Sequence, residues 1–131
     1  MLKKYIDNTF VHIGSAFIFM GAWAYFANRL HAPHQAIFAA VLQGMLSATI
    51  TFFMKKALEG LSAFFIGKKW RWPALVATPL IVCTGSLILL VSAHVMAGTP
   101  ELFATIALPF SVAFSYACFY SLRLWLKEYG T

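Results

Sequence analysis

Residues 35–72, with the proline that follows them, decide the fold and read QAIFAAVLQGMLSATITFFMKKALEGLSAFFIGKKWRWP. The part up to Met54 is apolar and has the length of roughly 20 residues that a helix needs to cross the hydrocarbon of a bilayer. The remainder is basic and ends in Trp70-Arg71-Trp72. An apolar run of spanning length followed by cations and tryptophans is typical of a membrane helix that reaches a lipid–water interface.

The composition of the whole chain indicates the same solvent. Of its 131 residues, 61% are hydrophobic and only 11% are charged, whereas a soluble domain has about 25% charged residues. In hydrocarbon every backbone amide must be paired within the protein, so only helices or closed barrels can span a bilayer. The apolar runs are long and do not alternate, which favours helices. We therefore predict an all-α, four-helix integral membrane bundle that forms one membrane domain over residues 1–131.

The apolar runs and the prolines between them define the four helices. Pro79 lies near the start of the third helix, where a kink or a local break is expected. Cys83 and Cys118 lie inside apolar runs, and we expect two buried thiols rather than a disulfide. The predicted helices cover about residues 9–28, 35–66, 73–97 and 101–126.

Residues 55–66 form a basic amphipathic segment between the second and third spans. The segment either continues the second helix or bends near Gly60 and lies in the membrane interface. Its sequence predicts an apolar face and an opposite polar face, formed by Ala57, Leu58, Leu61, Phe64 and Phe65 against Lys55, Lys56, Glu59 and Ser62.

Small residues fall on one side of the second helix and large apolar residues fall on the other side. Small side chains let helices approach closely in lipid, and polar ones bond across the contact. The small side includes Gln43, Ser47 and Thr51, and we expect it to face protein. Further rows of small residues lie on the third helix (Ala74, Thr78, Gly85, Ser92) and on the fourth (Ala104, Ala107, Ser111, Ser115, Cys118, Leu122). Two such rows, on the second and fourth helices, predict a homo-oligomer or a subunit of a larger membrane complex.

The distribution of cations predicts the orientation. With a cytoplasmic N-terminus, only Arg29 lies outside, and nine cations lie inside: Lys3, Lys4, Lys55, Lys56, Lys68, Lys69, Arg71, Arg123 and Lys127. Short loops with this bias follow the positive-inside rule. We therefore predict a multi-pass protein of the cell inner (cytoplasmic) membrane with both termini cytoplasmic. The net charge of +6 lies at the ends of apolar runs, which favours contact with anionic lipid over nucleic acid, through Lys55, Lys56, Lys68, Lys69, Trp70, Arg71 and Trp72.

Few side chains within the predicted spans can carry chemistry. No Asp, Glu, Lys or Arg lies in the middle of a predicted span, because Asp7, Glu59 and Glu101 lie at or beyond its edges. A proton pump keeps a titratable group there, so a proton-driven mechanism is not expected. His12 is the ionisable residue inside a span, and it either bonds a neighbouring helix or contacts a proton or substrate.

The row of Gln43, Ser47 and Thr51 either lines a substrate path or joins two helices. His31, His34 and His94 at the outer side are weak candidates for a metal site, since histidine is a common ligand of Zn and Cu. No nucleophile–base arrangement or phosphate-binding loop is found, so we predict no catalytic residue, no cofactor and no enzyme.

The function that the sequence favours is passage of a small solute or lipid across or within the membrane. In that case His12, Gln43, Ser47 and Thr51 contact the path. The alternative is a non-catalytic accessory or assembly subunit of a larger membrane complex.

Overall fold

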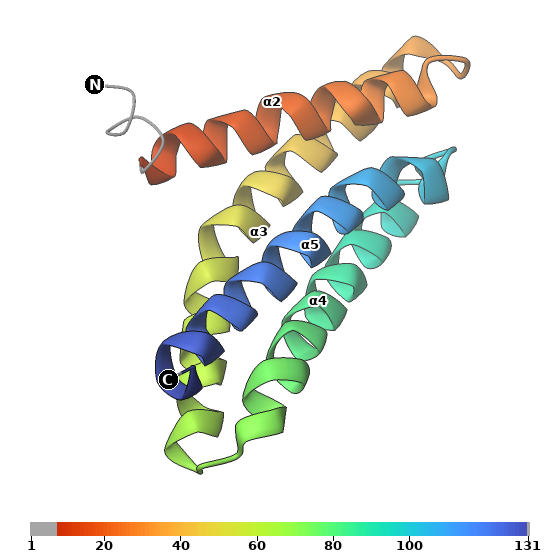
Figure 1. Cartoon of the computed structure of the whole chain (residues 1–131). Coiled ribbons are helices and arrows are strands. Elements are labelled where there is room, and N and C mark those ends of the chain that lie inside the picture. The colour runs from red at the N-terminus through yellow and green to blue at the C-terminus, as the bar shows by residue number, and fades with distance from the viewer. Residues whose placement is uncertain (1–7, 131) are drawn as a thin grey trace.

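The computed structural model of the protein describes residues 8–130, which form helices joined by short turns (Figure 1). No strand occurs in this range. Each helix is long and apolar enough to cross a membrane. The prediction of an all-α, four-helix chain is confirmed for these residues, and the chain has the features of a multi-pass membrane protein. Lys3, Lys4 and Asp7 lie outside the described range. The helices are α2 (Thr9–Asn28), α3 (Pro33–Gly67), α4 (Arg71–Met96) and α5 (Leu102–Tyr129).

Proline marks the true starts of two helices. α3 begins at Pro33, because the fixed φ of proline suits the first position of a helix and its missing N–H is not needed there. Pro73 stands in the first turn of α4 for the same reason, so α4 begins at Arg71 and the connecting turn contains only residues 68–70. The local break expected at Pro79 is not found, since α4 is one helix to Met96.

α2 packs closely along the first half of α3 through glycines. A Cβ atom added at Gly21 would lie 3.0 Å from the carbonyl oxygen of Ala40, and one at Gly44 would lie 3.0 Å from that of Phe17. The expected protein-facing side of this half of α3 is therefore correct. α2 also contacts α5 but not α4 within the described residues. In Figure 1 the first turns of α2 stand apart from α4 and α5.

The second half of α3 packs against both α4 and α5, which also contact each other. α3 continues without interruption through Gly60 to Gly67, so residues 55–66 extend the helix rather than bend away from it. Leu58 is fully buried and belongs to a core cluster with Met54, Cys83 and Ala117. Cys83 and Cys118 are free thiols, the first buried and the second partly buried.

The predicted faces of this extension need correction. Ser62 was placed on the polar face but is buried, while Ala57 and Phe64 are exposed. On α4, Ala74 and Thr78 are buried, but Gly85 and Ser92 are exposed. On α5, Ser111 and Ser115 are exposed, and the buried residues are Thr105, Ile106, Pro109, Ala117 and Ser121. The reason is physical: lipid accepts apolar side chains as readily as the core does, so hydrophobicity does not tell the two sides of a membrane helix apart.

Candidate functional site

The molecule has two ends with different chemistry. We call the end that holds the turns at residues 29–32 and 97–101 the two-turn end. We call the part of α3, α4 and α5 from Lys55 to the turn at residues 68–70 the basic end. The two-turn end contains most of the buried hydrogen bonds between side chains, and the basic end contains most of the cations.

A chain of hydrogen bonds at the two-turn end joins α3 to α4. His94 Nε2 lies 2.8 Å from Gln43 Oε1, and Gln43 Nε2 donates to Ser47 Oγ at 2.8 Å. Because the amide oxygen of Gln43 can only accept, His94 Nε2 donates. The other ring nitrogen, Nδ1, lies 2.8 Å from Thr99 Oγ1 in the α4–α5 turn. Gln43 and His94 are 0% exposed, and all their side-chain polar atoms have partners.

A second set of bonds joins α2 to α5 at the same end. Asn28, the last residue of α2, donates to Thr105 Oγ1 at 2.8 Å and accepts from the backbone N–H of Glu101 at 3.0 Å. Trp23 Nε1 donates to the carbonyl of Ala104 at 2.8 Å. His31 and Glu101 form an exposed ion pair with 2.7 Å between Nε2 and Oε1. The two sets together fix both turns against each other.

Within the single chain, Gln43 and Ser47 are buried, and they are bonded to each other and to α4. These contacts join α3 to α4, and a path along the row in a larger assembly stays a prediction. Thr51 is partly buried and takes no part in this chain of bonds. His12 is exposed in the first turn of α2, at the opposite end of that helix from Asn28. The sequence did not single out Asn28, Thr99 or Thr105, because they resemble ordinary turn residues.

The three candidate metal-binding histidines are not brought together. Both ring nitrogens of His94 are used by Gln43 and Thr99, and His31 is paired with Glu101. His34 borders a shallow pocket of about 220 Å³ beside Thr99 and Pro100. Within residues 8–130 no three His, Cys, Asp or Glu side chains are arranged to hold a metal ion.

Aromatic rings and cations build the far tip of the basic end. Trp125 Nε1 donates to the carbonyl of Arg71 at 3.0 Å, and the guanidinium of Arg71 lies 4.9 Å from the centre of the Trp125 ring. Trp72 stacks on Trp125 with ring centres 6.4 Å apart and is 67% exposed. Lys68 and Lys69 are exposed in the adjacent turn. This tip presents tryptophan and positive charge on one surface.

Lys55 and Lys56 do not share this tip, although the sequence suggested one basic belt. Twelve residues separate Lys56 from Lys68 along one helix, which is about 18 Å. Leu58, two residues after Lys56, packs against Cys83 in the middle of α4. Three charged residues of α3, Lys55, Lys56 and Glu59, thus lie beside the central turns of α4. The sequence placed these charges beyond the end of the second span, and it could not show that they lie at the level of the middle of α4, because it does not give the register of α3 against α4.

Glu59 is held by a tyrosine of α5. Tyr120 donates its hydroxyl to Glu59 Oε1 at 2.5 Å. Tyr116, one turn earlier on α5, stacks on Tyr120 with ring centres 5.6 Å apart and planes at 17°. No ion pair within residues 8–130 involves Glu59. The sequence showed the spacing of Tyr116 and Tyr120 but not that Glu59 lies opposite them.

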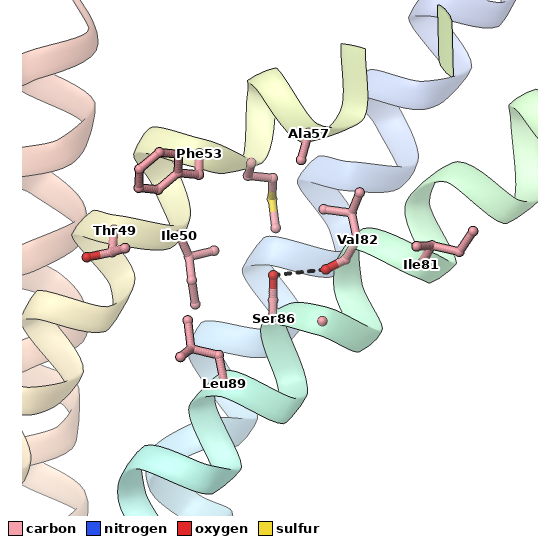
Figure 2. Close-up of a pocket in the computed structure, with 10 residues that line it drawn as sticks. Thr49, Ile50, Phe53, Ala57, Ile81, Val82, Ser86 and Leu89 are labelled. Carbon is pink, nitrogen blue, oxygen red and sulfur yellow. Dashed lines mark hydrogen bonds between the residues drawn. The ribbon is translucent and has the colours of Figure 1, made fainter. Parts of the chain in front are cut away.

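An apolar groove lies between α3 and α4 at the level of these charges (Figure 2). Its volume is about 240 Å³. Ile50 of α3 lies opposite Ser86 and Leu89 of α4, and the Ser86 hydroxyl donates to the carbonyl of Val82 at 3.0 Å. Gly85 leaves the groove open, because a Cβ atom there would meet nothing within 4 Å. The lining residues are Thr49, Ile50, Phe53, Met54 and Ala57 of α3 and Ile81, Val82, Gly85, Ser86 and Leu89 of α4.

Lys56 borders this groove. It precedes the lining residue Ala57 and follows the lining residue Phe53 by three positions, which makes them neighbours on the helix surface. Its Nζ atom lies 4.8 Å from the centre of the Phe52 ring. Lys56 therefore lies beside the end of the groove that is nearer the basic tip, and its ammonium group stands over the Phe52 ring outside the groove lining.

Comparisons with known protein families, curated proteins and solved structures find no match to this chain. The class of the protein therefore rests on the fold and the site. Within the described residues it is an all-helical protein with four helices that can cross a membrane, a bonded polar core at one end, an apolar groove at the middle of α3 and α4, and a charged surface from there to the other end.

Proposed function

We propose that the protein binds an anionic amphiphile, in the first place a phospholipid, and moves it within the inner leaflet of the cell inner membrane. Both termini are cytoplasmic in this proposal, as the distribution of cations predicts. The observation that carries it is the apolar α3–α4 groove with Lys56 at one end. An acyl chain suits the groove, and the phosphate of the same lipid suits the lysine.

The lengths of α2 and of the first part of α3 support one position in the membrane. α2 is 20 residues long, and α3 from Pro33 to Lys55 has a similar length, about 30–35 Å at 1.5 Å per residue. Both match a hydrocarbon thickness of about 30 Å. A lysine at the bilayer centre costs about 2.5–3.5 kcal/mol, so the cytoplasmic boundary is best drawn at Lys55 and Lys56. The charged residues Lys55, Lys56 and Glu59 of α3 then stand at the level of the lipid headgroups.

In this position the groove is oriented like a lipid of the inner leaflet, from the headgroup level toward the bilayer centre. From Lys56 the groove runs toward Thr49 and Leu89, that is, toward the bilayer centre. Its extent along α3, from Ala57 to Thr49, is about 12 Å. A lipid with its phosphate at Lys56 therefore has its acyl chain in the groove. The cations and tryptophans of the basic tip supply further attraction for anionic headgroups.

A second candidate is a non-catalytic accessory or assembly subunit. The specific observation in its favour is the row of small residues on α5, where Ser111 and Ser115 are exposed rather than packed within the chain. Such a row suits close contact with another membrane helix, from a second copy or from a partner subunit.

Native mass spectrometry of the detergent-purified protein tests the lipid proposal. Gly85→Leu places a large side chain in the groove, and Gly14→Leu is the matched control, since a Cβ atom at either glycine meets nothing within 4 Å. We expect Gly85→Leu to reduce retained phosphatidylglycerol at least several-fold and Gly14→Leu to leave it unchanged. Lys56→Ala is expected to weaken retention more than Lys69→Ala. Equal retention by the wild type and Gly85→Leu would overturn the proposal.

A further inference from the structure

The face of α3 that carries Lys55 and Glu59 lies away from the groove. Lys55 and Glu59 each follow a groove-lining residue, Phe53 and Ala57, by two positions, which is about 200° around the helix. They lie four residues apart on a shared face. Among the described residues of α3, the groove side carries the cation Lys56, whereas this side carries a cation and an acid.

The Glu59 carboxylate is held in place by Tyr120, and one of its two oxygens has no hydrogen-bond partner within residues 8–130. Tyr120 bonds Oε1, and no hydrogen bond or ion pair within residues 8–130 uses Oε2. Lys55 makes no ion pair with it, although their spacing would allow one. A carboxylate that is fixed by one phenol and forms no ion pair with a described lysine or arginine is suited to an external cation.

The aromatic neighbours favour an organic ammonium group. Tyr116 and Tyr120 stack side by side next to the carboxylate, and Tyr116 is 44% exposed. Aromatic faces attract ammonium groups through the ring quadrupole. A carboxylate beside two tyrosine rings thus offers both an ion-pair partner and a cation–π surface.

The order of the two charges along α3 matches a zwitterionic headgroup. α3 runs toward the basic tip, so Glu59 lies one turn, about 6 Å, nearer that tip than Lys55. In an inner-leaflet phospholipid the phosphate is attached next to the glycerol, and the amine lies beyond it on a short linker. Lys55 is therefore at the level of the phosphate, and Glu59 is at the level of the amine.

We infer that Lys55 and Glu59 of α3, with Tyr116 and Tyr120 of α5, form a headgroup site for a zwitterionic aminophospholipid. The phosphate binds Lys55, and the primary ammonium binds Glu59 Oε2 against the tyrosine rings. Tyr120 acts as a positioning residue for the carboxylate. The inference goes beyond the groove but rests on the membrane position proposed above.

Competition between two lipids tests this site. The full-length protein is incubated with an equimolar mixture of phosphatidylethanolamine and phosphatidylglycerol that have identical acyl chains, and native mass spectrometry gives the ratio bound. Glu59→Gln removes the charge but still accepts the hydrogen bond from Tyr120. Glu128→Gln makes the same charge change in the last turn of α5 and is the matched control.

We expect Glu59→Gln to lower the bound ratio of phosphatidylethanolamine to phosphatidylglycerol at least three-fold and Glu128→Gln to leave it unchanged. Tyr120→Phe is expected to lower the ratio less, because the ring remains. If Glu59→Gln does not fold, the bound lipid ratio of Tyr120→Phe alone tests the inference. A wild-type ratio in Tyr120→Phe and in a folded Glu59→Gln would overturn the inference. The lipid proposal for the groove fails separately, through Gly85→Leu.

Discussion

Gln43 and His94 at the two-turn end and the hydroxyls of Ser62, Thr78 and Ser121 at the basic end are almost equally buried. The first pair has a hydrogen-bond partner for every side-chain polar atom. The three hydroxyls have none in the described structure. Burial alone therefore does not say what a polar group contributes. A bonded group fixes the register of its helices. An unbonded group loses its hydrogen bonds to water on burial and gains none in the protein, so it destabilises the fold.

The same contrast holds for the exposed charges. At the two-turn end Glu101 is paired with His31, while at the basic end Glu59 has a phenol but no ion pair within residues 8–130. At the two-turn end the acid is paired within the chain, whereas at the basic end the acid is available to a group outside the chain. We expect substitutions at the two-turn end to change stability and those at the charged surface of the basic end to change binding.

The largest effect on stability is expected for His94→Ala. The change leaves Gln43 Oε1 and Thr99 Oγ1 without their partner and opens a cavity, so the free energy of unfolding should fall by about 3 kcal/mol. Reversible unfolding in mixed detergent micelles measures it. Ser86→Ala is the control, because Ser86 bonds only the carbonyl of its own helix. A loss no larger than that of the control would contradict a stabilising network.

A smaller effect is expected where α2 meets α3. In Gly21→Ala the new methyl group would lie 3.0 Å from the carbonyl oxygen of Ala40, so the free energy of unfolding should fall by about 1–2 kcal/mol. Gly14→Ala on the same helix meets nothing within 4 Å and should be neutral or slightly stabilising through helix propensity. The same unfolding assay compares the two. If both alanines behave alike, the close α2–α3 contact is wrong.

The smallest effect, with the opposite sign, is expected for the unbonded hydroxyls. Ser62→Ala and Thr78→Val remove a buried hydroxyl while nearly keeping the shape of the side chain. Each should leave the free energy of unfolding unchanged or raise it by up to about 1 kcal/mol, because no hydrogen bond is lost. Unfolding midpoints are compared with those of Ser47→Ala, which does remove a bond. A clear destabilisation by Ser62→Ala would show that its hydroxyl has a partner in the membrane.

The sequence was sufficient for the number, type and approximate bounds of the helices, because a run of about 20 apolar residues admits few structures in lipid. It also predicted that the side of the second helix with Gln43 and Ser47 faces protein. It could not place Glu59 opposite Tyr120, or Lys56 beside the middle of α4. Those facts depend on the register between helices, and membrane helices carry little register information in their apolar surfaces. Ser62 was assigned to the wrong face for the same reason.

The central claim is that the charged stretch of α3 stands among lipid headgroups, and a depth measurement tests it most directly. A nitroxide is attached to a cysteine at Gly60, where an added side chain meets nothing within 4 Å, or at the exposed Ile88 of α4, after Cys83 and Cys118 are changed to alanine. In bilayers the account predicts that the label at residue 60 is reached by a water-soluble relaxation agent and that the label at residue 88 is reached by dissolved oxygen. Equal, oxygen-rich surroundings for both labels would contradict it.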